Sequence, residues 1–409
     1  MNQIPTLNKS LTISIFNKDA NKQTNADTKY LIQLGCNNYV VSTATKNLIE
    51  ILLIEPKELI TLSELYHAHF QEHLNSNEIL QLIEQYIPKS LLEGAPAVPA
   101  KTPFTISRIV LSPSMVEFLS SKLTWLFKPL VALFLVSIFS TIHGYALINE
   151  FNLSTNSWND TNVYLFLLVM LFSFFVHEFG HATACRNFDC NHGGIGVGLY
   201  LIFPVFFADV TSAWRLSKYQ RAVIDLGGLY FQAILLIFID LIALHLNSAL
   251  CAKLSTVITF TMLYTLNPFL KFDGYWLLSD LSGETNLHRK MRTTIRSIVS
   301  QAFKLSSLSN ILLKNSKLIL AYSALSIAFI IYCINFLFNE FKYIYSELPL
   351  KLELWLNNYT LATDNTFSKF TLAIDLIGIF IWPLLLCTFL LFAIKKLMSL
   401  IIFEPKEPT

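Results

Sequence analysis

The sequence NVYLFLLVMLFSFFVHEFGHATAC, residues 162–185, contains a long apolar run that ends in two histidines and a glutamate. Its length fits the roughly 20 apolar residues that a helix needs to cross a membrane. On such a helix His177 and His181 project from one face and can share a metal ion. Glu178 lies beside them, where it can accept a proton from an attacking water. Ionisable groups are costly inside a membrane, which favours a functional site over polar side chains that only bond to neighbouring helices.

The composition of the whole chain also indicates a membrane protein. Of its 409 residues, 53% are hydrophobic and 14% are charged, and the mean hydropathy is +0.50. Soluble domains carry about 25% charged residues. The net charge of +2 gives no sign of a nucleic-acid partner. The six cysteines have no CxxC spacing, so neither a disulfide framework nor a thiolate zinc site is expected.

Six apolar segments are long enough, or nearly so, to cross a membrane. They lie near 125–147, 162–185, 221–247, 254–272, 317–338 and 371–394. Arginine and lysine concentrate in the loops that face the cytoplasm if the N-terminus is inside. The chain begins MNQIPTLNKS, without the apolar stretch of a cleavable signal peptide. We therefore expect an integral protein of the bacterial inner membrane, with both termini in the cytoplasm.

The segment HGGIGVGLYLIFPVFFADVTSAW, 192–214, fits no spanning helix. Its glycines and proline oppose a helix, while its aromatic and β-branched residues favour strands. Non-helical backbone at membrane depth must be surrounded by protein or by a water-filled cavity. We predict a re-entrant β-hairpin that lines a cavity beside the 162–185 helix, with Asp209 near that cavity. A loop folded against the cytoplasmic face of the bilayer is the alternative.

A third metal ligand is expected from NPFLKFDGYW, 267–276. Catalytic zinc sites use three protein ligands and keep one position open. The apolar segment that precedes this stretch would run from outside to inside, which brings Asp273 to the cytoplasmic depth of the two histidines. Pro268 interrupts the helix and Gly274 permits a tight turn, so the carboxylate can point inward. An aspartate that only caps a helix is the alternative.

Two further features near the motif have ordinary explanations. Cys185 lies four residues past His181, but a thiolate ligand there would close the site, so metal binding is not expected. Arg221 and Asp225 lie at the start of the third apolar segment, where we expect an ion pair at the membrane interface.

HEFGH, followed in a later apolar segment by NPFLKFDG, resembles the site-2 protease family of intramembrane metalloproteases over roughly residues 160–280. The resemblance implies a zinc ion bound by His177, His181 and Asp273. It also implies that Glu178 is the general base and that Asn267 helps to hold the polarised carbonyl.

The hairpin of this family, which holds an extended substrate strand, corresponds to residues 192–214. The stretch DLGGLYFQ, 225–232, departs from the family pattern. It has a second glycine where the family has proline, followed by Gln232. The departure leaves open whether Gln232 positions the substrate.

Residues 1–93 look like a small cytoplasmic α+β domain. Strands are predicted at 11–16, 29–34 and 39–43, and helices near 44–55, 61–73 and 76–86. Residues 94–123 are expected to be a linker followed by an amphipathic helix that leads to the membrane. They precede a transmembrane metalloprotease domain at 124–396 and a cytoplasmic tail at 397–409.

The stretch 196–228 is similar to a branch of the family known as peptide zinc metalloproteases, which is tied to peptide maturation and export. Members of that branch often begin with a PqqD-like domain. The resemblance implies that residues 29–90 bind the leader of a ribosomally made peptide by pairing it with an exposed strand edge. A small regulatory or assembly domain is the alternative.

The expected protein is thus a mainly α polytopic membrane protein with about six transmembrane helices, a re-entrant β-hairpin and a small N-terminal α+β domain. It would hydrolyse a peptide bond of a membrane-associated or secreted-peptide precursor. Its expected partners are that peptide, the lipid bilayer and an export transporter. Two alternatives are a signalling protease that cuts a membrane-anchored regulator and an export component without proteolytic activity. The inverted repeats of a transporter are not seen in the sequence.

Overall fold

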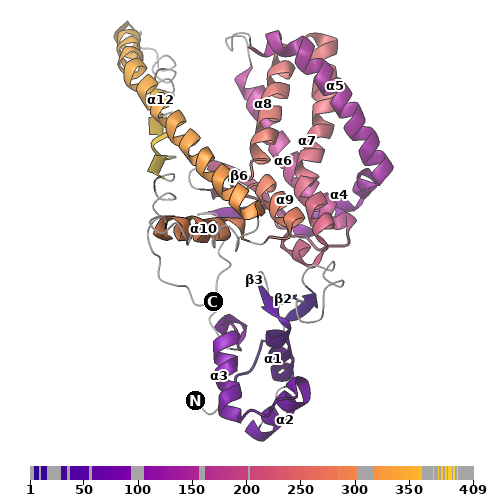
Figure 1. Cartoon of the computed structure of the whole chain (residues 1–409). Helices are drawn as coiled ribbons and strands as arrows, with labels where there is room; N and C mark the ends of the chain where they lie inside the picture. The colour runs from indigo at the N-terminus through magenta and orange to yellow at the C-terminus, as the bar shows by residue number, and fades with distance from the viewer. Residues whose placement is uncertain are drawn as a thin grey trace. The chain divides into compact units, whose positions relative to one another are not determined.

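The computed structural model describes most of the chain. The described residues are 4–8, 11–15, 29–34, 37–54, 58–93, 106–155, 162–200, 203–284, 286–301 and 317–361, with scattered positions between 372 and 394. They are mainly helical and include two three-stranded sheets (Figure 1). The chain divides into two compact units, Met1–Gly283 and Glu284–Thr409, which are described separately below.

The N-terminal domain contains an antiparallel sheet followed by three helices. The sheet has the order β1 (Thr12–Ile15), β2 (Lys29–Leu34) and β3 (Asn37–Ser42). The helices are α1 (Thr43–Leu53), α2 (Leu59–Phe70) and α3 (Ser76–Tyr86), and a 3-10 turn, η3 (Lys89–Leu91), follows them. The predicted strands and helices are therefore present, with bounds that differ by a few residues.

Local sequence explains where these helices begin, and burial explains why they stay together. Ser42 accepts a hydrogen bond from the backbone of Thr45 at the start of α1. Asn75 and Glu78 form a capping box at the start of α3. The apolar faces meet in one core, whose fully buried members are Ile32, Ile49, Ile51, Leu62, Ile79 and Leu91. This domain has a hydrophobic core of its own.

Four described helices are long and apolar enough to cross a membrane. These apolar stretches are Pro129–Asn149 in α5 (Pro129–Thr155), α6 (Val163–Asn187), α7 (Lys218–Leu246) and Lys317–Thr360 in α12 (Lys317–Leu361). Their outer faces carry large exposed apolar side chains, among them Leu130, Ile148 and Tyr164. Such faces suit lipid, because a soluble protein rarely exposes contiguous apolar surface of this size.

The remaining two predicted spans differ from the four. The segment predicted at 254–272 forms α8 (Ala249–Thr265), a shorter apolar helix of 17 residues. It ends at Thr265 because Asn267 and Pro268 follow, and proline cannot continue the backbone hydrogen bonds of a helix. The predicted span at 371–394 lies largely outside the described residues. The count of about six spans therefore stays a prediction.

Helices α5 to α8 pack side by side, with α7 in contact with each of the other three (Figure 1). A buried polar cluster joins α5, α7 and α8. Nδ1 of His143 lies 2.8 Å from a carboxylate oxygen of Asp240, and Nε2 of His143 lies 3.0 Å from the hydroxyl of Thr259. Ser255 donates to the other oxygen of Asp240. Buried polar groups need such partners, so this cluster accounts for an aspartate inside an apolar helix.

The predicted hairpin is present as β5 (Ile195–Tyr200) and β6 (Phe203–Ala208), which pair antiparallel. A third strand, β4 (Ser107–Leu111), pairs with β5, so the sheet has the order β4-β5-β6. The stretch predicted as an amphipathic helix therefore divides into strand β4 and helix α4 (Pro113–Ser121). Ser112 caps α4, and Pro113 occupies its first position. Whether the hairpin is re-entrant in a membrane stays a prediction.

The first unit also contains two 3-10 turns, η4 (Thr124–Phe127) before α5 and η5 (Thr211–Arg215) before α7. Its last element is helix α9 (Asp273–Ser282). In the second unit, α10 (Leu287–Gln301) contacts the long helix α12.

Candidate metal centre

Helix α6 places two histidines one turn apart, as the motif predicts. His177 and His181 are both buried, and their Nε2 atoms lie 3.1 Å apart. The first half of α6 carries exposed leucine, phenylalanine and tyrosine side chains, whereas the second half is buried by α4 and α7. The two imidazoles are thus held in the protein-covered part of the helix.

Asp273, the third candidate ligand, comes from a different element. It is the first residue of α9, and its Oδ2 lies 3.0 Å from Nε2 of His177 and 3.3 Å from Nε2 of His181. A close approach of the backbone makes this position possible. A Cβ atom on Gly274 would lie 1.9 Å from the carbonyl oxygen of Leu266, so only glycine fits there.

The other ring nitrogen of each histidine is engaged by α7. Nδ1 of His177 lies 3.0 Å from Oε1 of Gln232, and Nδ1 of His181 lies 2.7 Å from the carbonyl oxygen of Ile224. The amide nitrogen of Gln232 donates to Ser173 at 3.0 Å, which turns its oxygen towards His177. Both acceptors favour the tautomer with a proton on Nδ1. The Nε2 lone pairs are then free for a metal ion.

These residues fit a zinc ion by the chemistry of their donors. The two imidazoles and the carboxylate bring their ligand atoms within 4.8 Å of one another. Oδ2 of Asp273 is buried and faces the Nε2 atoms of both histidines, which have no proton to donate when the proton is on Nδ1. A buried carboxylate oxygen without a donor is costly unless a cation satisfies it. Two neutral histidines and one carboxylate are a ligand set found in catalytic zinc sites.

Glu178 lies next to this centre and is held by the sheet. Its Oε2 accepts a hydrogen bond of 2.8 Å from the backbone N–H of Ala208, the last residue of β6. The hydrogen bond links the helix that carries the metal ligands to the edge strand of the hairpin. An apolar cluster fixes the same contact, because Val116, Phe179, Ile195 and Phe231 are buried together.

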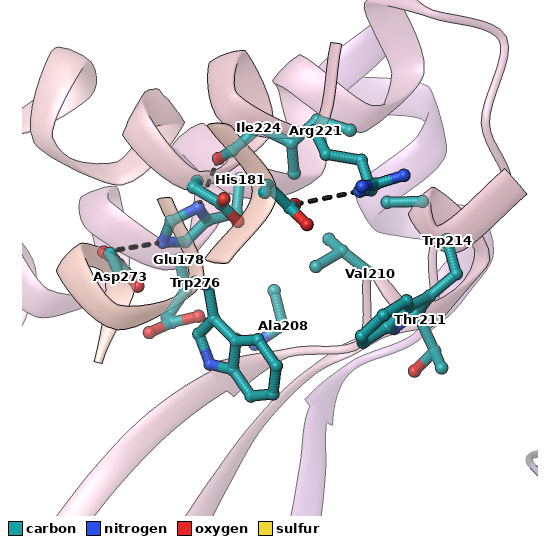
Figure 2. A pocket seen from close by; sticks show the side chains of 13 residues that line it. Glu178, His181, Ala208, Val210, Thr211, Trp214, Arg221, Ile224, Asp273 and Trp276 are labelled. Carbon is teal, nitrogen blue, oxygen red and sulfur yellow. Dashed lines mark hydrogen bonds and ion pairs between the residues drawn. The ribbon is translucent and has the colours of Figure 1, made fainter. Parts of the chain in front are cut away.

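A cavity of about 290 Å³ opens beside Glu178, His181 and Asp273 (Figure 2). It is large enough for part of a peptide and lies at the lower end of the size range of ligand pockets, roughly 300–1,000 Å³. The other residues that line it come from the hairpin, η5, α7 and α9. They are Ala208, Val210, Thr211, Ala213, Trp214, Arg221, Ile224, Asp225, Trp276 and Asp280.

Charged side chains gather on the α7 and α9 side of this cavity. Nε of Arg221 lies 2.9 Å from Oδ2 of Asp280, and Nη1 of Arg221 donates to the carbonyl oxygen of Leu216 at 2.8 Å. Arg221 therefore pairs with Asp280, whereas the sequence suggested a pair with Asp225. Burial raises the pKa of the Asp280 carboxyl, and the adjoining Arg221 guanidinium opposes that rise.

Glycines allow α6 and α7 to cross at very short distance. A Cβ atom on Gly180 would lie 2.2 Å from the carbonyl oxygen of Gly227, and one on Gly228 would lie 2.6 Å from the His177 ring. The second glycine of DLGG thus makes room for a metal ligand. Gln232, the residue that departs from the family pattern, hydrogen-bonds to His177 in this chain.

Three sequence-predicted residues have local roles in the structure. The side chain of Asn267 accepts from the backbone of Phe269 at 2.9 Å and is not among the residues that line the cavity, so its catalytic role stays a prediction. Asp209 accepts from the backbone of Thr211 at 3.1 Å, in a turn after β6. Cys185 is buried and donates to the carbonyl oxygen of Cys190.

Four residues of the site were not selected from the sequence. Ser173 and the two tryptophans, Trp214 and Trp276, carry no motif that would indicate them. Asp280 does carry a signal, because it lies seven residues after Asp273 on α9 and therefore on the same helix face.

The chain is similar to a protein of Bacillus subtilis (strain 168) named "Putative peptide zinc metalloprotease protein YydH", with 26% identity over 164 residues. The match covers 40% of this chain and 64% of that protein, so the chain spans less than two thirds of that relative. No family model and no solved structure matches the chain. The similarity supports a protease-like role and a metalloprotease, and the zinc in that name agrees with the donor set of His177, His181 and Asp273.

Proposed function

We propose that this chain is an intramembrane zinc metalloprotease that hydrolyses a peptide bond of a membrane-associated or secreted-peptide precursor. The observation that carries the proposal is the convergence of His177, His181 and Asp273 beside Glu178 and an open cavity. His177, His181 and Asp273 would hold the zinc ion, which supplies Lewis-acid chemistry when bound.

Glu178 is the general base in this proposal. Oε2 of Glu178 is anchored by Ala208, and the same carboxylate lines the cavity. It accepts a proton from the attacking water and passes it to the leaving amine, as a carboxylate beside a reacting centre does. The anchoring hydrogen bond holds the carboxylate at one position relative to the peptide.

The free edge of β6 is the proposed docking site for the substrate backbone. Strand β6 is at the edge of its sheet, and the N–H of Ala208 faces Glu178. Alternate residues of a strand direct their backbone groups to opposite edges, so the backbone groups of Phe206 face the same free edge. A peptide that pairs there as an extended strand reaches Glu178 with its scissile carbonyl exposed, which a helical peptide would not offer.

The proposed setting is the inner membrane, with both termini in the cytoplasm and the metal centre in the cytoplasmic half of the bilayer. The name of the similar protein supports a peptide as the substrate class. We therefore favour peptide maturation or export, in which a transporter would carry the product. Cleavage of a membrane-anchored regulator uses the same site and differs only in its substrate.

The experiment that tests the proposal uses the full chain, purified in detergent and loaded with zinc. A peptide library made by cleavage of a proteome after glutamate serves as substrate, and mass spectrometry detects new peptide termini. We expect Glu178→Gln to lower cleavage by about 10²- to 10⁴-fold, because the general base is lost. Glu353→Gln, which changes an exposed glutamate of α12, is the matched control. Equal cleavage by wild type and Glu178→Gln would refute the protease.

A further inference from the structure

The cavity beside Glu178 contains charged groups that the proposed hydrolysis does not use. Arg221 and Asp225 come from α7 and Asp280 comes from α9. The positive charge is already committed, because Arg221 pairs with Asp280 and also donates to the backbone of Leu216. This part of the cavity therefore has two acidic side chains and one basic side chain, so one acidic group has no cation to balance it.

Asp225 is the carboxylate in excess. Its side chain hydrogen-bonds to Asp280, but its Oδ2 is buried and has no hydrogen-bond partner among the described residues, although the side chain lines the cavity. Leaving a carboxyl oxygen buried and unsatisfied costs more free energy than a neutral hydrogen bond returns. A cationic group that enters the cavity would remove this penalty.

Two tryptophans in the lining suit the long stem of such a cation. Trp214 of η5 and Trp276 of α9 lie edge to face, with ring centroids 6.0 Å apart (Figure 2). Tryptophan faces attract ammonium and guanidinium groups and also cover methylene chains. Val210 and Ile224 add apolar surface to the lining of the cavity.

We propose, on the basis of the proposed proteolysis, that this cavity is a specificity pocket for a lysine or arginine side chain of the peptide substrate. Asp225 binds the charged end, the two tryptophans contact the stem, and the Arg221–Asp280 pair holds α7 and α9 in place. Ala208 hydrogen-bonds to Glu178 and also lines the cavity. A peptide strand that pairs with β6 passes Ala208, so one side chain of the peptide enters the pocket.

A substrate anchored in the membrane would bring a lysine or arginine side chain close to this pocket. Basic residues are enriched at the cytoplasmic ends of apolar segments. A substrate whose apolar segment lies in the bilayer therefore brings a lysine or arginine close to a site in the cytoplasmic half. The pocket would then fix which bond lies at Glu178.

The first test is cleavage of the same peptide library, in which internal lysines and arginines are intact. We expect them at one fixed position from the cut bond. For a peptide cut by wild type, Asp225→Asn should lower kcat/KM about 10- to 100-fold, and replacing that lysine by norleucine should remove the effect of the mutation. Asp225→Glu, which keeps the carboxylate, should restore part of the rate. Asp189→Asn, at an exposed aspartate, is the matched control.

The second test measures binding without cleavage. Glu178→Gln protein is titrated with acetyl-Ala-Lys-Ala amide and with its norleucine analogue, and saturation-transfer NMR gives both Kd values. We expect the lysine peptide to bind about 10- to 100-fold more tightly, and Asp225→Asn to abolish the difference.

The outcomes separate this inference from the proposed function. If cleavage depends on Glu178 but shows no basic preference, or a preference that Asp225→Asn leaves unchanged, the pocket is refuted and the protease stands. If no cleavage depends on Glu178, the protease fails. Equal binding of the two tripeptides would refute the pocket in either case.

Discussion

At the residue scale, the candidate metal centre is supported by groups that are not themselves candidate ligands. Gln232 and the carbonyl oxygen of Ile224 accept hydrogen bonds from the Nδ1 atoms of the two histidines. Ser173 in turn fixes the amide of Gln232. Groups of this kind hold the tautomer and orientation of a ligand, and their loss typically lowers metal affinity 10- to 100-fold.

We therefore expect Gln232→Ala to weaken zinc binding about 10- to 100-fold, since His177 loses its hydrogen-bond acceptor. Zinc content after equilibration with a competing chelator measures this. Gln232→Glu keeps an acceptor and should retain most of the affinity.

Two further variants set the scale for that measurement. Asp273→Ala removes a ligand and should lower zinc content more than Gln232→Ala does. Gln81→Ala changes an exposed glutamine of α3 and should leave zinc content as in wild type. If Gln232→Ala binds zinc like Gln81→Ala, the hydrogen bond to His177 does not support the ligand.

The three candidate ligands could be selected from the sequence because each has a recognisable local signal. His177 and His181 have the spacing of one helix turn, and Asp273 stands between a helix-breaking Pro268 and Gly274. Gln232 was selected only as a departure from a family pattern. Its contact with His177 joins residues 55 positions apart, which no local pattern shows.

At the element scale, the crossing of α6 and α7 brings the histidines to their partners. Gly180 and Gly227 meet backbone to backbone at this crossing. Small residues at such contacts let membrane helices approach closely, where packing and hydrogen bonds replace the hydrophobic effect.

We expect Gly180→Ala to destabilise the protein by about 1–3 kcal/mol, because the added methyl group overlaps the carbonyl oxygen of Gly227. Thermal unfolding in detergent should show a lower Tm. Gly144→Ala in α5 is the control, because no atom lies within 4 Å of its added Cβ, and its Tm should be unchanged or slightly higher. An equal Tm for both variants would show that the close crossing does not limit stability.

The sheet shows where element prediction from sequence fails. Residues 107–111 have strand composition, but nothing local indicates that they pair with β5, almost ninety positions later. The pairing of β4 with β5 is decided by contacts between segments far apart in the sequence. This pairing also requires Gly194 and Gly196, since a Cβ at either position would clash with the backbone of β4.

At the scale of the whole molecule, residues 1–93 contain a hydrophobic core of their own, and we predict that they fold independently. Its buried core draws on the sheet and all three helices, and its chain ends meet where Leu7 pairs with Leu92. A domain with its own core can fold alone.

We expect residues 1–93, produced as a separate fragment, to unfold cooperatively in urea with a free energy of unfolding of roughly 5 kcal/mol. Circular dichroism follows the transition. Ile49→Ala should lower the free energy of unfolding by about 2–5 kcal/mol, since Ile49 is fully buried. Ile60→Ala, at a side chain that is 69% exposed, is the control. A fragment without a cooperative transition would contradict an independent domain.

The sequence by itself determined four long apolar helices, the strand and helix order of residues 1–93, and the choice of three candidate metal ligands. Each follows from composition or from spacing within a few turns of chain, where the physics is local. The tertiary structure decided what surrounds those ligands: the acceptors of α7 behind the histidines, the strand that anchors Glu178, and the Arg221–Asp280 pair in the cavity. These contacts join distant segments and arise only when helix crossing and sheet pairing bring the segments together.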